Sequence, residues 1–294
     1  MGASRPARLN TEAQHGLLLI APPLIYALLL LAAPLGIILV ISFWSQSGLT
    51  IDRTPTLENY REAFTDPLYR QLLVRSIWVA GLVTFVTVVL AFPIAYFVSF
   101  HVAPSRKALW LFLITIPFWT SYLIRVFLWK VILGFNGVLN SSLQAMGFIE
   151  EPLTFILYNV NAVVITLAHA YAPFAILPIY VALERIDKSL IEAAMDLGET
   201  AASAFLRVTL PLAMPGVVAA TLIVFIPTIG DYVTPRLVGG PGGLLIANMI
   251  QTQFLRLNNM PMGATLAIVA MVSVALIALA FVWLNRRYLK SAKR

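Results

Sequence analysis

Six long apolar segments, separated by shorter polar ones, organise the chain. They cover about residues 16–44, 72–100, 108–133, 155–183, 212–229 and 264–284. One helical crossing of a bilayer core about 30 Å thick needs about 20 mostly apolar residues. Inside lipid, only helices and closed barrels satisfy the backbone polar groups. The pattern therefore predicts an all-α polytopic membrane protein with six transmembrane helices within residues 16–284.

The first and the fifth apolar segments differ from ordinary transmembrane helices. The first has the position of a signal peptide, but it is too long, follows about fifteen polar residues and lacks a small-residue cleavage site. We therefore expect a retained helix, kinked at its prolines. The fifth segment is short, and its Pro227-Thr-Ile-Gly230 sequence predicts a helix break near the outer leaflet. Irregular backbone at that depth is tolerated where it lines a cavity or is buried in protein, so this break is a candidate gate element.

Composition supports a membrane protein and excludes several other classes. The chain is 60% hydrophobic and 11% charged, with a mean hydropathy of +0.87, whereas soluble domains are about 45–50% apolar and about 25% charged. The absence of cysteine excludes a disulfide scaffold, a thiol nucleophile and a cysteine-ligated metal site. The net charge of +7 is typical of cytoplasmic anchoring charges in a membrane protein, so no nucleic-acid partner is expected.

The basic residues predict the orientation. With six alternating spans, one side carries Arg5, Arg8, Arg106, Lys107, Arg185, Lys188, Arg207, Arg286, Arg287, Lys290, Lys293 and Arg294. The other carries only Arg53, Arg61, Arg70, Arg75, Arg236 and Arg256. This excess predicts that both termini are cytoplasmic, with an N-terminal segment 1–15, a loop 184–211 and a basic tail 285–294. Arg125 and Lys130 fall near the outer end of the third span, where long side chains can snorkel.

The cytoplasmic loop 184–211 predicts two short helices. Ser189-x-x-Glu192 has the form of a capping box, with Asp187 as a rival N-cap. Gly198 follows the last apolar residue and suits a left-handed C-cap, and a second helix is expected from about residue 200 to 207. From the residues alone, an interfacial helix lying on lipid headgroups and a docking surface are equally good interpretations.

The same loop resembles a known family. Glu192-Ala193-Ala194-x3-Gly198-x9-Val208-x-Leu210-Pro211 is similar to the EAA motif of binding-protein-dependent ABC importer permeases, with Val208 where the usual pattern has Ile. In that family the segment is a coupling helix that docks on the cytoplasmic ATPase. The resemblance implies the ATPase-coupling residues Glu192, Ala193, Ala194, Asp196, Gly198, Leu210 and Pro211, although Glu192 could serve only as a cap.

The resemblance also implies a fold, partners and a location. Type I importer permeases are bundles that work as pairs, here most simply a heterodimer with a second permease subunit, although a homodimer is not excluded. Two cytoplasmic ABC ATPase subunits would use ATP and Mg, and an extracytoplasmic solute-binding protein would deliver the solute. The chain would be a non-catalytic, multi-pass subunit in contact with lipid in the bacterial inner membrane, without a cofactor or metal of its own.

Several further segments resemble the spermidine/putrescine type of permease, across about residues 70–284. They are Pro117-Phe-Trp-Thr-Ser-Tyr-Leu-Ile-Arg125, Asn136-Gly137 with Asn140, Leu183-Glu184-Arg-Ile-Asp187, and Phe225-Ile-Pro-Thr-Ile-Gly-Asp-Tyr-Val-Thr-Pro235 with Leu237-Val-Gly-Gly240. Arg236 departs from that type, which commonly has an acid there. The resemblance implies a polyamine, with an opine, an amino-acid derivative, a phosphonate or iron as rival solutes.

Asp231 is the candidate solute residue, because it is the only acid after Glu199 and lies at the outer end of the fifth span. An acid at a membrane boundary is costly unless it faces water or a partner, and aromatic rings near it favour a cation. The candidate path residues are therefore Asp231, Tyr232, Trp119, Tyr122, Tyr171 and Arg125, the last for an anion. Alternatively, Asp231 forms a turn and an ion pair with Arg236 or Arg125, and Trp119 belongs to the interfacial belt.

Other functions are disfavoured by what the sequence lacks. It contains neither a P-loop nor a GxGxxG motif, and no paired carboxylates, HExxH, Ser-Lys or Ser-His arrangement of an enzyme. His169 lacks a second ligand at metal-binding spacing, so a hydrogen bond between helices is expected instead. An autonomous channel remains an alternative, and its flux would survive substitution of Glu192 or Gly198.

Overall fold

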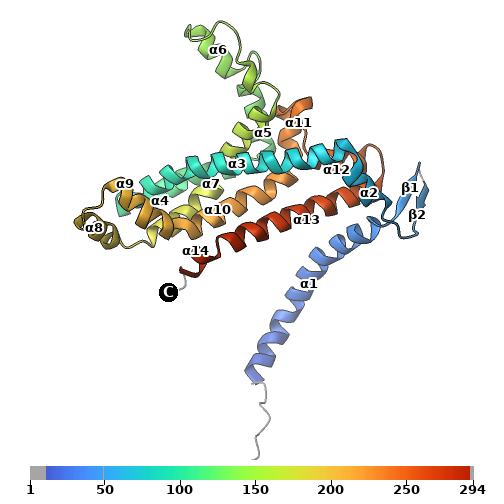
Figure 1. The fold of residues 1–294 in the computed structure, drawn as a ribbon, viewed down its shortest axis with the longest axis horizontal. Helices are drawn as coiled ribbons and strands as arrows, with labels where there is room; N and C mark the ends of the chain where they lie inside the picture. Colours follow the sequence, from blue (N-terminus) through green and yellow to red (C-terminus); the bar gives the residue numbers. More distant parts are fainter. Residues whose placement is uncertain (1–10, 49, 292–294) are drawn as a thin grey trace, which may run out of the picture.

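The long helices form a membrane-type bundle in the computed structural model, which describes residues 11–48 and 50–291. Residues 1–10 of the predicted N-terminal segment and 292–294 of the basic tail lie outside the described residues. Five helices are long and apolar enough to cross a membrane: α1 (Thr11–Ile41), α3 (Pro67–Phe100), α7 (Val160–Glu184), α10 (Leu210–Gly230) and α13 (Met260–Leu284). The chain thus has the predicted helical membrane fold (Figure 1).

The third predicted span is broken rather than straight. α4 (Pro104–Thr115) passes into a 3-10 turn, Ile116–Trp119, and α5 (Tyr122–Ile132) then turns by 88°. Thr120 and Ser121 between them are extended, with ψ of 146° and 136°. The prediction of one helix over 108–133 is wrong here, because two extended residues redirect the chain. The two pieces make a sixth span only when they are counted together.

The predicted break in the fifth span comes at the end of the Pro227-Thr-Ile-Gly230 segment and not at its proline. α10 continues through Pro227 and ends at Gly230, and Asp231 after it is extended, so the segment forms a plain helix end and not a break within the helix. Packing explains the difference, because Val224 and Thr228 beside the proline are buried, and the Thr228 hydroxyl donates to the Val224 carbonyl at 2.6 Å. The single hydrogen bond that proline removes is not enough to end a helix held in this way.

The core of the bundle lies where α3, α7 and α10 meet. Val79, Val83, Ile179 and Ala213 are among the side chains fully buried there. The approach is closest at Gly216 of α10, where an added Cβ would lie 2.5 Å from both the Pro178 carbonyl oxygen and the Ala182 Cβ of α7. Small residues allow such close packing, which drives helix association in lipid.

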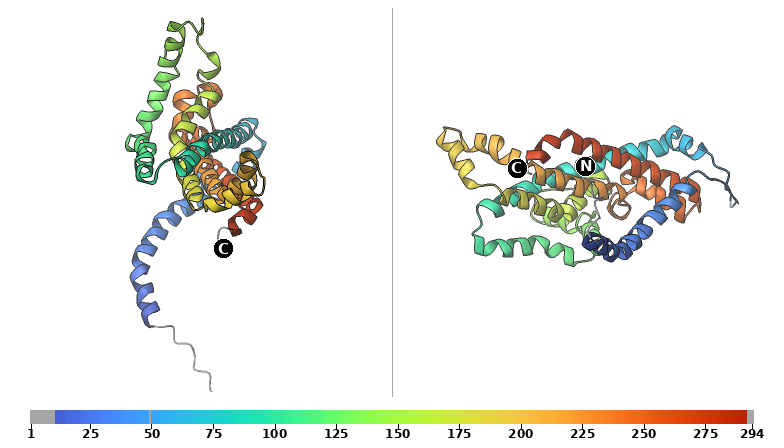
Figure 2. Two further views of the ribbon diagram at one scale, coloured as in Figure 1. Left: turned by 90° about the vertical axis from the view of Figure 1, so that its left-hand side faces the viewer. Right: turned by 90° about the horizontal axis from the view of Figure 1, so that it is seen from below.

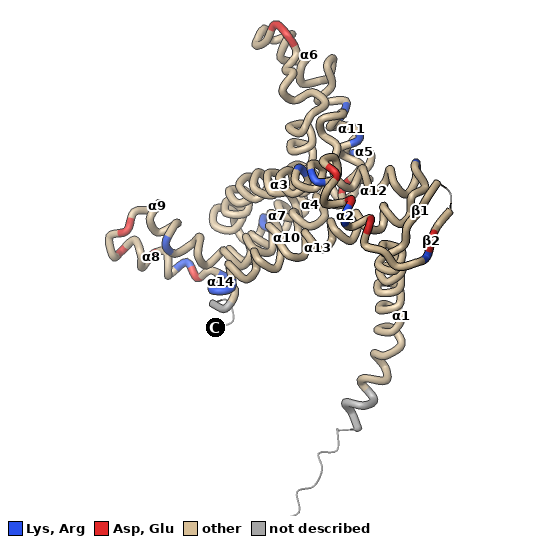
Figure 3. The backbone as a smooth tube through the Cα atoms, turned by 45° about the vertical axis from the view of Figure 1, so that its right-hand side comes forward, with Lys and Arg blue, Asp and Glu red and all other residues tan. Residues whose placement is uncertain are grey.

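The two ends of the bundle differ, and we call them the α8 end and the α12 end. At the α8 end lie α8 (Lys188–Asp196), α9 (Ala201–Ala204), a π-helical segment Phe205–Thr209 that runs directly into α10, and α14 (Arg286–Ser291). The predicted second loop helix is therefore joined to α10, and Pro211 lies in the first turn of α10. Charged residues gather at the ends, and the middle of the bundle is almost free of them (Figure 3).

Short elements cap the α12 end. A hairpin pairs β1 (Ser45–Ser47) with β2 (Thr50–Asp52) in antiparallel register, and α2 (Glu58–Thr65) and α12 (Ile246–Leu255) follow beside α3 and α13. The Thr265 hydroxyl of α13 donates to the Ser42 carbonyl at 2.9 Å, which ties the end of α1 to the bundle. The rest of α1 diverges from the bundle (Figure 1), and α5 with α6 (Val138–Ala145) projects from the opposite side.

Candidate functional site

α8 carries the predicted coupling residues and begins at Asp187. The Asp187 carboxylate accepts the Ser189 backbone N–H at 3.0 Å, and this hydrogen bond lowers the pKa of Asp187. Ser189 therefore lies inside the first turn, and the predicted capping box of Ser189 and Glu192 is wrong. The rival N-cap is the one that forms, because its side chain reaches the free N–H groups of the first turn.

α8 ends in a left-handed cap at Gly198, as the sequence predicts. Gly198 has φ of +91°, and its N–H donates to the Met195 carbonyl at 2.9 Å, while the Glu199 N–H donates to the Ala194 carbonyl at 3.1 Å. These two bonds form a Schellman motif, and a glycine tolerates this backbone without strain. The helix therefore has a defined length and a sharp end.

α8 packs against the bundle only through the partly buried Ile191. It contains no buried residue, and Leu190, Met195 and Leu197 are 49%, 49% and 86% exposed. Of the predicted coupling residues, four lie in α8 and Gly198 closes it, whereas Leu210 and Pro211 lie apart in the first turn of α10. Exposed apolar side chains on a short, well-capped helix form a surface suited to docking on another protein.

Asp231 is buried where α10 passes into α11 (Val233–Val238). It is 8% exposed and accepts three hydrogen bonds: from the Tyr122 hydroxyl at 2.6 Å, from the Val233 N–H at 2.9 Å and from the Thr234 N–H at 3.3 Å. Within residues 11–48 and 50–291, no Lys or Arg nitrogen lies within 4.0 Å of this carboxylate. The alternative of an ion pair with Arg236 or Arg125 is therefore wrong for this structure.

Thr234 completes this site, and sequence reasoning missed it. Its side chain is fully buried, and its hydroxyl shares a 2.7 Å hydrogen bond with the Tyr122 hydroxyl. The signal was present, because Asp231 followed three residues later by Thr234 has the spacing of an N-cap residue and the N3 position. Tyr122 thus links α5 to both the acid and the first turn of α11.

Arg125 lies inside the protein, against α7. It is 9% exposed, its guanidinium donates to the carbonyls of Thr120 at 3.3 Å and Ala170 at 3.5 Å, and its Nε has no hydrogen-bond partner. The guanidinium carbon also lies 5.9 Å from the centre of the Phe118 ring. The snorkelling prediction is wrong, because the turn before α5 points Arg125 at α7.

An aromatic cluster continues from there along α5 and α7. The Trp129 indole N–H donates to His169 Nδ1 at 3.1 Å, which confirms the predicted hydrogen bond between helices. Since that indole can only donate, Nδ1 carries no proton. Tyr171 of α7 has its ring centre 6.2 Å from that of Phe174 on the same helix, and its side chain also lies near Tyr122 and the Asp231 carboxylate. This candidate residue therefore belongs to the surroundings of Asp231.

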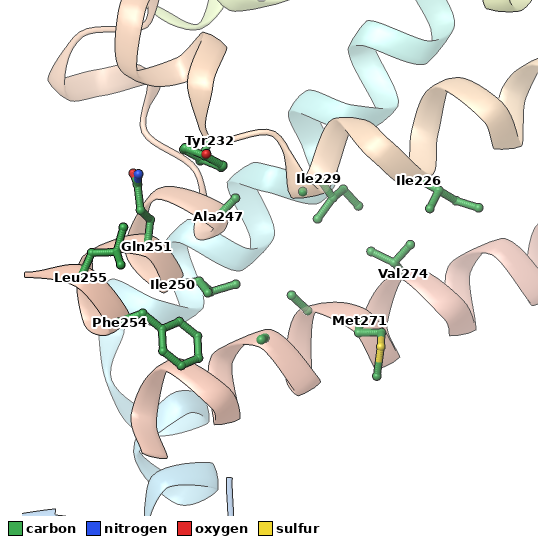
Figure 4. A pocket seen from close by; sticks show the side chains of 13 residues that line it. Ile226, Ile229, Tyr232, Ala247, Ile250, Gln251, Phe254, Leu255, Met271 and Val274 are labelled. Atoms are coloured by element: carbon green, nitrogen blue, oxygen red, sulfur yellow. The ribbon is translucent and has the colours of Figure 1, made fainter. Parts of the chain in front are cut away.

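The remaining two candidates point elsewhere. Trp119 is 75% exposed, with its ring edge-on to Phe112. Tyr232 follows Asp231 in the sequence, but it lines a cavity that Asp231 does not line (Figure 4). The structure therefore brings Tyr122 and Tyr171 to Asp231. It holds Arg125 separately, against the α7 backbone, and leaves Trp119 and Tyr232 outside both sets of contacts.

The cavity beside Tyr232 is an open apolar groove of about 570 Å³ between α10, α12 and α13. Its walls include Ile229, Ile250 and Met271, and Gln251 lies at its rim (Figure 4). The Asp231 carboxylate does not line it. Walls of this kind suit hydrocarbon and do not suit a polycation, because a buried charge needs a paired or hydrogen-bonding group.

Comparison with known proteins gives a consistent result. Residues 68–290 match the family described as "binding-protein-dependent transport system inner membrane component". The spermidine/putrescine transport system permease protein PotB of Haemophilus influenzae is 38% identical over 85% of this chain and 87% of its own length. The inner membrane ABC transporter permease protein YdcU of Escherichia coli is 34% identical over 82% and 80% of the two chains.

Solved structures agree on the fold. A chain of a bacterial alginate ABC transporter, in complex with an alginate pentasaccharide-bound periplasmic protein, superposes with a TM-score of 0.73 at 18% identity. The match covers 95% of this chain and 98% of the other. The bent α4–α5 pair and the projecting helices thus belong to a fold that a solved transporter shares.

Proposed function

The chain belongs to the family of binding-protein-dependent transport system inner membrane components, and we propose that it forms half of the translocation path of an ATP-driven importer for a polyamine such as spermidine or putrescine. The observation that carries the solute assignment is the buried Asp231 carboxylate, which is held by Tyr122 and forms no ion pair with a basic side chain of residues 11–48 and 50–291. A protonated polyamine supplies a positive charge to pair with it. Relatives at 38% identity are named for spermidine and putrescine transport.

Arg125 restricts where a polyamine would bind. Its guanidinium lies one helical turn beyond Tyr122 on α5, and its positive charge opposes a second cation beside it. The polyamine is therefore expected on the Asp231 side of Tyr122, away from the contact between Arg125 and Ala170. Arg236 does not compete for the carboxylate, since its guanidinium donates to the Gln251 side chain at 3.2 Å.

The energy source is a partner. We infer that α8 docks on a cytoplasmic ABC ATPase subunit, which binds ATP and Mg, and that this chain hydrolyses nothing itself. The exposed Leu190, Met195 and Leu197 support this role, because the bundle leaves them uncovered. A second, different permease subunit would complete the path, and a solute-binding protein would dock at the α12 end.

We infer that the α8 end faces the cytoplasm. The residues that support it are Arg106, Lys107, Arg185, Lys188 and Arg207 at that end, since cytoplasmic loops carry an excess of Lys and Arg. Both termini then lie in the cytoplasm, as the basic tail after α13 also indicates. The family description already places the protein in the inner membrane.

Uptake by the complete importer tests the proposal. Proteoliposomes that contain both permease subunits and the ATPases would be given the binding protein, ATP and radiolabelled putrescine or spermidine. Asp231→Asn should lower uptake about 10- to 100-fold, because a hydrogen bond to a charged group is worth about 1.5–3 kcal/mol. Asp52→Asn removes an exposed carboxylate at the same end of the bundle and should leave uptake unchanged.

Two results would overturn the proposal. If the wild-type importer takes up neither polyamine but accumulates an anionic or zwitterionic solute, the solute assignment fails and the importer assignment stands. If solute crosses at the same rate without ATP, and if Gly198→Ala leaves that rate unchanged, the chain acts as an autonomous channel. The docking role of α8 then fails as well.

A further inference from the structure

α4 packs only lightly on the protein between its two ends. None of its residues is buried, and along its length Trp110 lies edge-on to Phe97 of α3 while the partly buried Ile114 packs against the core. Figure 2 shows it running beside the bundle, separate from the packed core of α3, α7 and α10. Because this side-chain packing is slight, the polar contacts at its ends contribute strongly to where it lies.

The contact at the α8 end is an ion pair that joins three helices. Lys107, in the first turn of α4, donates to both carboxylate oxygens of Glu184, at 2.6 and 2.8 Å. Ser99, in the last turn of α3, donates to the same carboxylate at 3.1 Å. The side chains of Lys107 and Glu184 are 14% and 41% exposed, so the lysine is well enclosed. One carboxylate thus holds the ends of α3, α4 and α7 together.

Glu184 is also the last residue of α7 before the coupling helix. Only Arg185 and Ile186 separate it from Asp187, the N-cap of α8. Ile186 is buried, and its N–H donates to the Leu183 carbonyl at 3.1 Å, so this connection is a tight turn. A displacement of α8 is therefore passed to Glu184, and through Lys107 to α4.

The contact at the other end is the candidate solute site. Residues Pro104–Trp119 form a nearly continuous rod about 26 Å long, at 1.5 Å per α-helical and about 2.0 Å per 3-10 residue. Two residues beyond it, Tyr122 donates to the Asp231 carboxylate at 2.6 Å and pairs with Thr234. The rod thus has the coupling helix at one end and the buried acid at the other.

We propose that α4 acts as a lever that couples α8 to the Asp231 site, with Lys107 and Glu184 as positioning residues. The inference rests on the proposed function, since it takes α8 as the ATPase-docking helix. When the docked ATPase shifts α8, the ion pair makes the start of α4 follow. The rod then moves Tyr122 relative to Asp231, which changes how the carboxylate is presented to a cation.

Uptake by the reconstituted importer tests the ion pair. Lys107→Met should lower ATP-driven uptake about fivefold, since a partly exposed ion pair is worth up to about 1 kcal/mol. Arg106→Met is the matched control, because it removes the same charge from the neighbouring, exposed position and should have no effect. The exchanged pair, Lys107→Glu with Glu184→Lys, should recover most of the lost uptake.

ATP hydrolysis distinguishes lost transmission from misfolding. With Lys107→Met, the importer should keep its basal ATPase rate while transport per ATP falls, whereas a misfolded chain would lose both. Lys107→Met combined with Asp231→Asn should be no worse than Asp231→Asn alone. If the two effects instead multiply as independent losses, the ends of α4 are not coupled and the proposal is overturned.

A distance measurement tests the motion without reference to the solute. The chain has no cysteine, so two cysteines can be introduced in one chain to carry spin labels. One replaces Leu123, which is 57% exposed at the start of α5, and the other replaces Leu276, which is 62% exposed on α13. Trapping the ATPases with ATP and vanadate should change the distance between the labels, and in Lys107→Met a smaller share of the molecules should show the change. A distance that does not respond in the wild type overturns the lever, whereas wild-type importer that fails to take up polyamines overturns only the proposed solute.

Discussion

Gly216 is the position at which the helix packing can be tested most directly. In Gly216→Ala, the added methyl group would lie 2.5 Å from the Pro178 carbonyl oxygen and the Ala182 Cβ, and 3.1 Å from the Ile179 Cα. Carbon atoms pack best at about 3.5–4.0 Å, so α7 and α10 would have to separate by about 1 Å. Two of these neighbours belong to the α7 backbone and cannot turn away as the end of a side chain can.

The cost of that separation follows from the same contacts. Overpacking a well-filled core costs about 1–3 kcal/mol, which corresponds to an apparent melting temperature lower by about 2–10 °C for a chain of this size. Uptake should fall too, because α7 leads into α8 and the segment after α8 runs directly into α10. The midpoint would be read from the loss of monodisperse importer on size-exclusion chromatography after heating.

Gly81 provides the matched control. It lies in α3, and a Cβ added there would meet no atom within 4 Å. Gly81→Ala should therefore leave the midpoint unchanged or raise it slightly, since alanine favours a helix by about 1 kcal/mol over glycine. If the two substitutions shift the midpoint equally, the close approach of α7 and α10 is not what holds them together.

Three further substitutions probe the helix ends. Gly198→Ala should weaken binding-protein-stimulated ATP hydrolysis, because a left-handed alanine costs about 1–2 kcal/mol, whereas Gly147→Ala, at φ +73°, carries the same strain away from α8 and should not. The lowered pKa of Asp187 stabilises α8 above the ordinary aspartate pKa, and this is lost as pH falls below about 4. In the wild type, amide hydrogen exchange in α8, corrected for intrinsic rates, should accelerate only below about pH 4. In Asp187→Ala it should already be faster at neutral pH. Ser76→Ala leaves the first N–H of α12 buried without an acceptor and should cost about 1–3 kcal/mol in the same heating assay, whereas Ser273→Ala, which loses only a bond within its own helix, should cost less.

The sequence predicts the features that depend on local or summed properties. Hydropathy summed over 20 or more residues locates the long helices, and Gly198 ends α8 because only glycine takes that backbone freely. The residues that line the Asp231 site were harder to find. Asp231 itself stands out as a lone acid, but its partner Tyr122, which also meets the Thr234 hydroxyl, lies more than a hundred residues earlier in the chain.

The wrong predictions share a physical cause, which is that packing decided between local alternatives. Pro227 has the chemistry of a helix breaker, yet the buried side chains beside it keep α10 continuous. The 88° turn before α5 depends on two extended residues, Thr120 and Ser121, which are too few to lower a hydropathy average taken over about 20 residues. Arg125 then follows this turn into the protein instead of toward the membrane surface.

The contrast between α1 and α7 has a consequence for synthesis of the protein. None of an 18-residue apolar window in α1 is buried by the rest of the chain, whereas 61% of the window in α7 is. α1 can therefore leave the translocon and stand alone in lipid as soon as it is made. α7 carries Asn161 and His169 between its apolar residues. Its stable insertion therefore requires packing against α3, which is made earlier. Biogenesis would then proceed in two steps, with an early autonomous helix and a later, mutually dependent bundle.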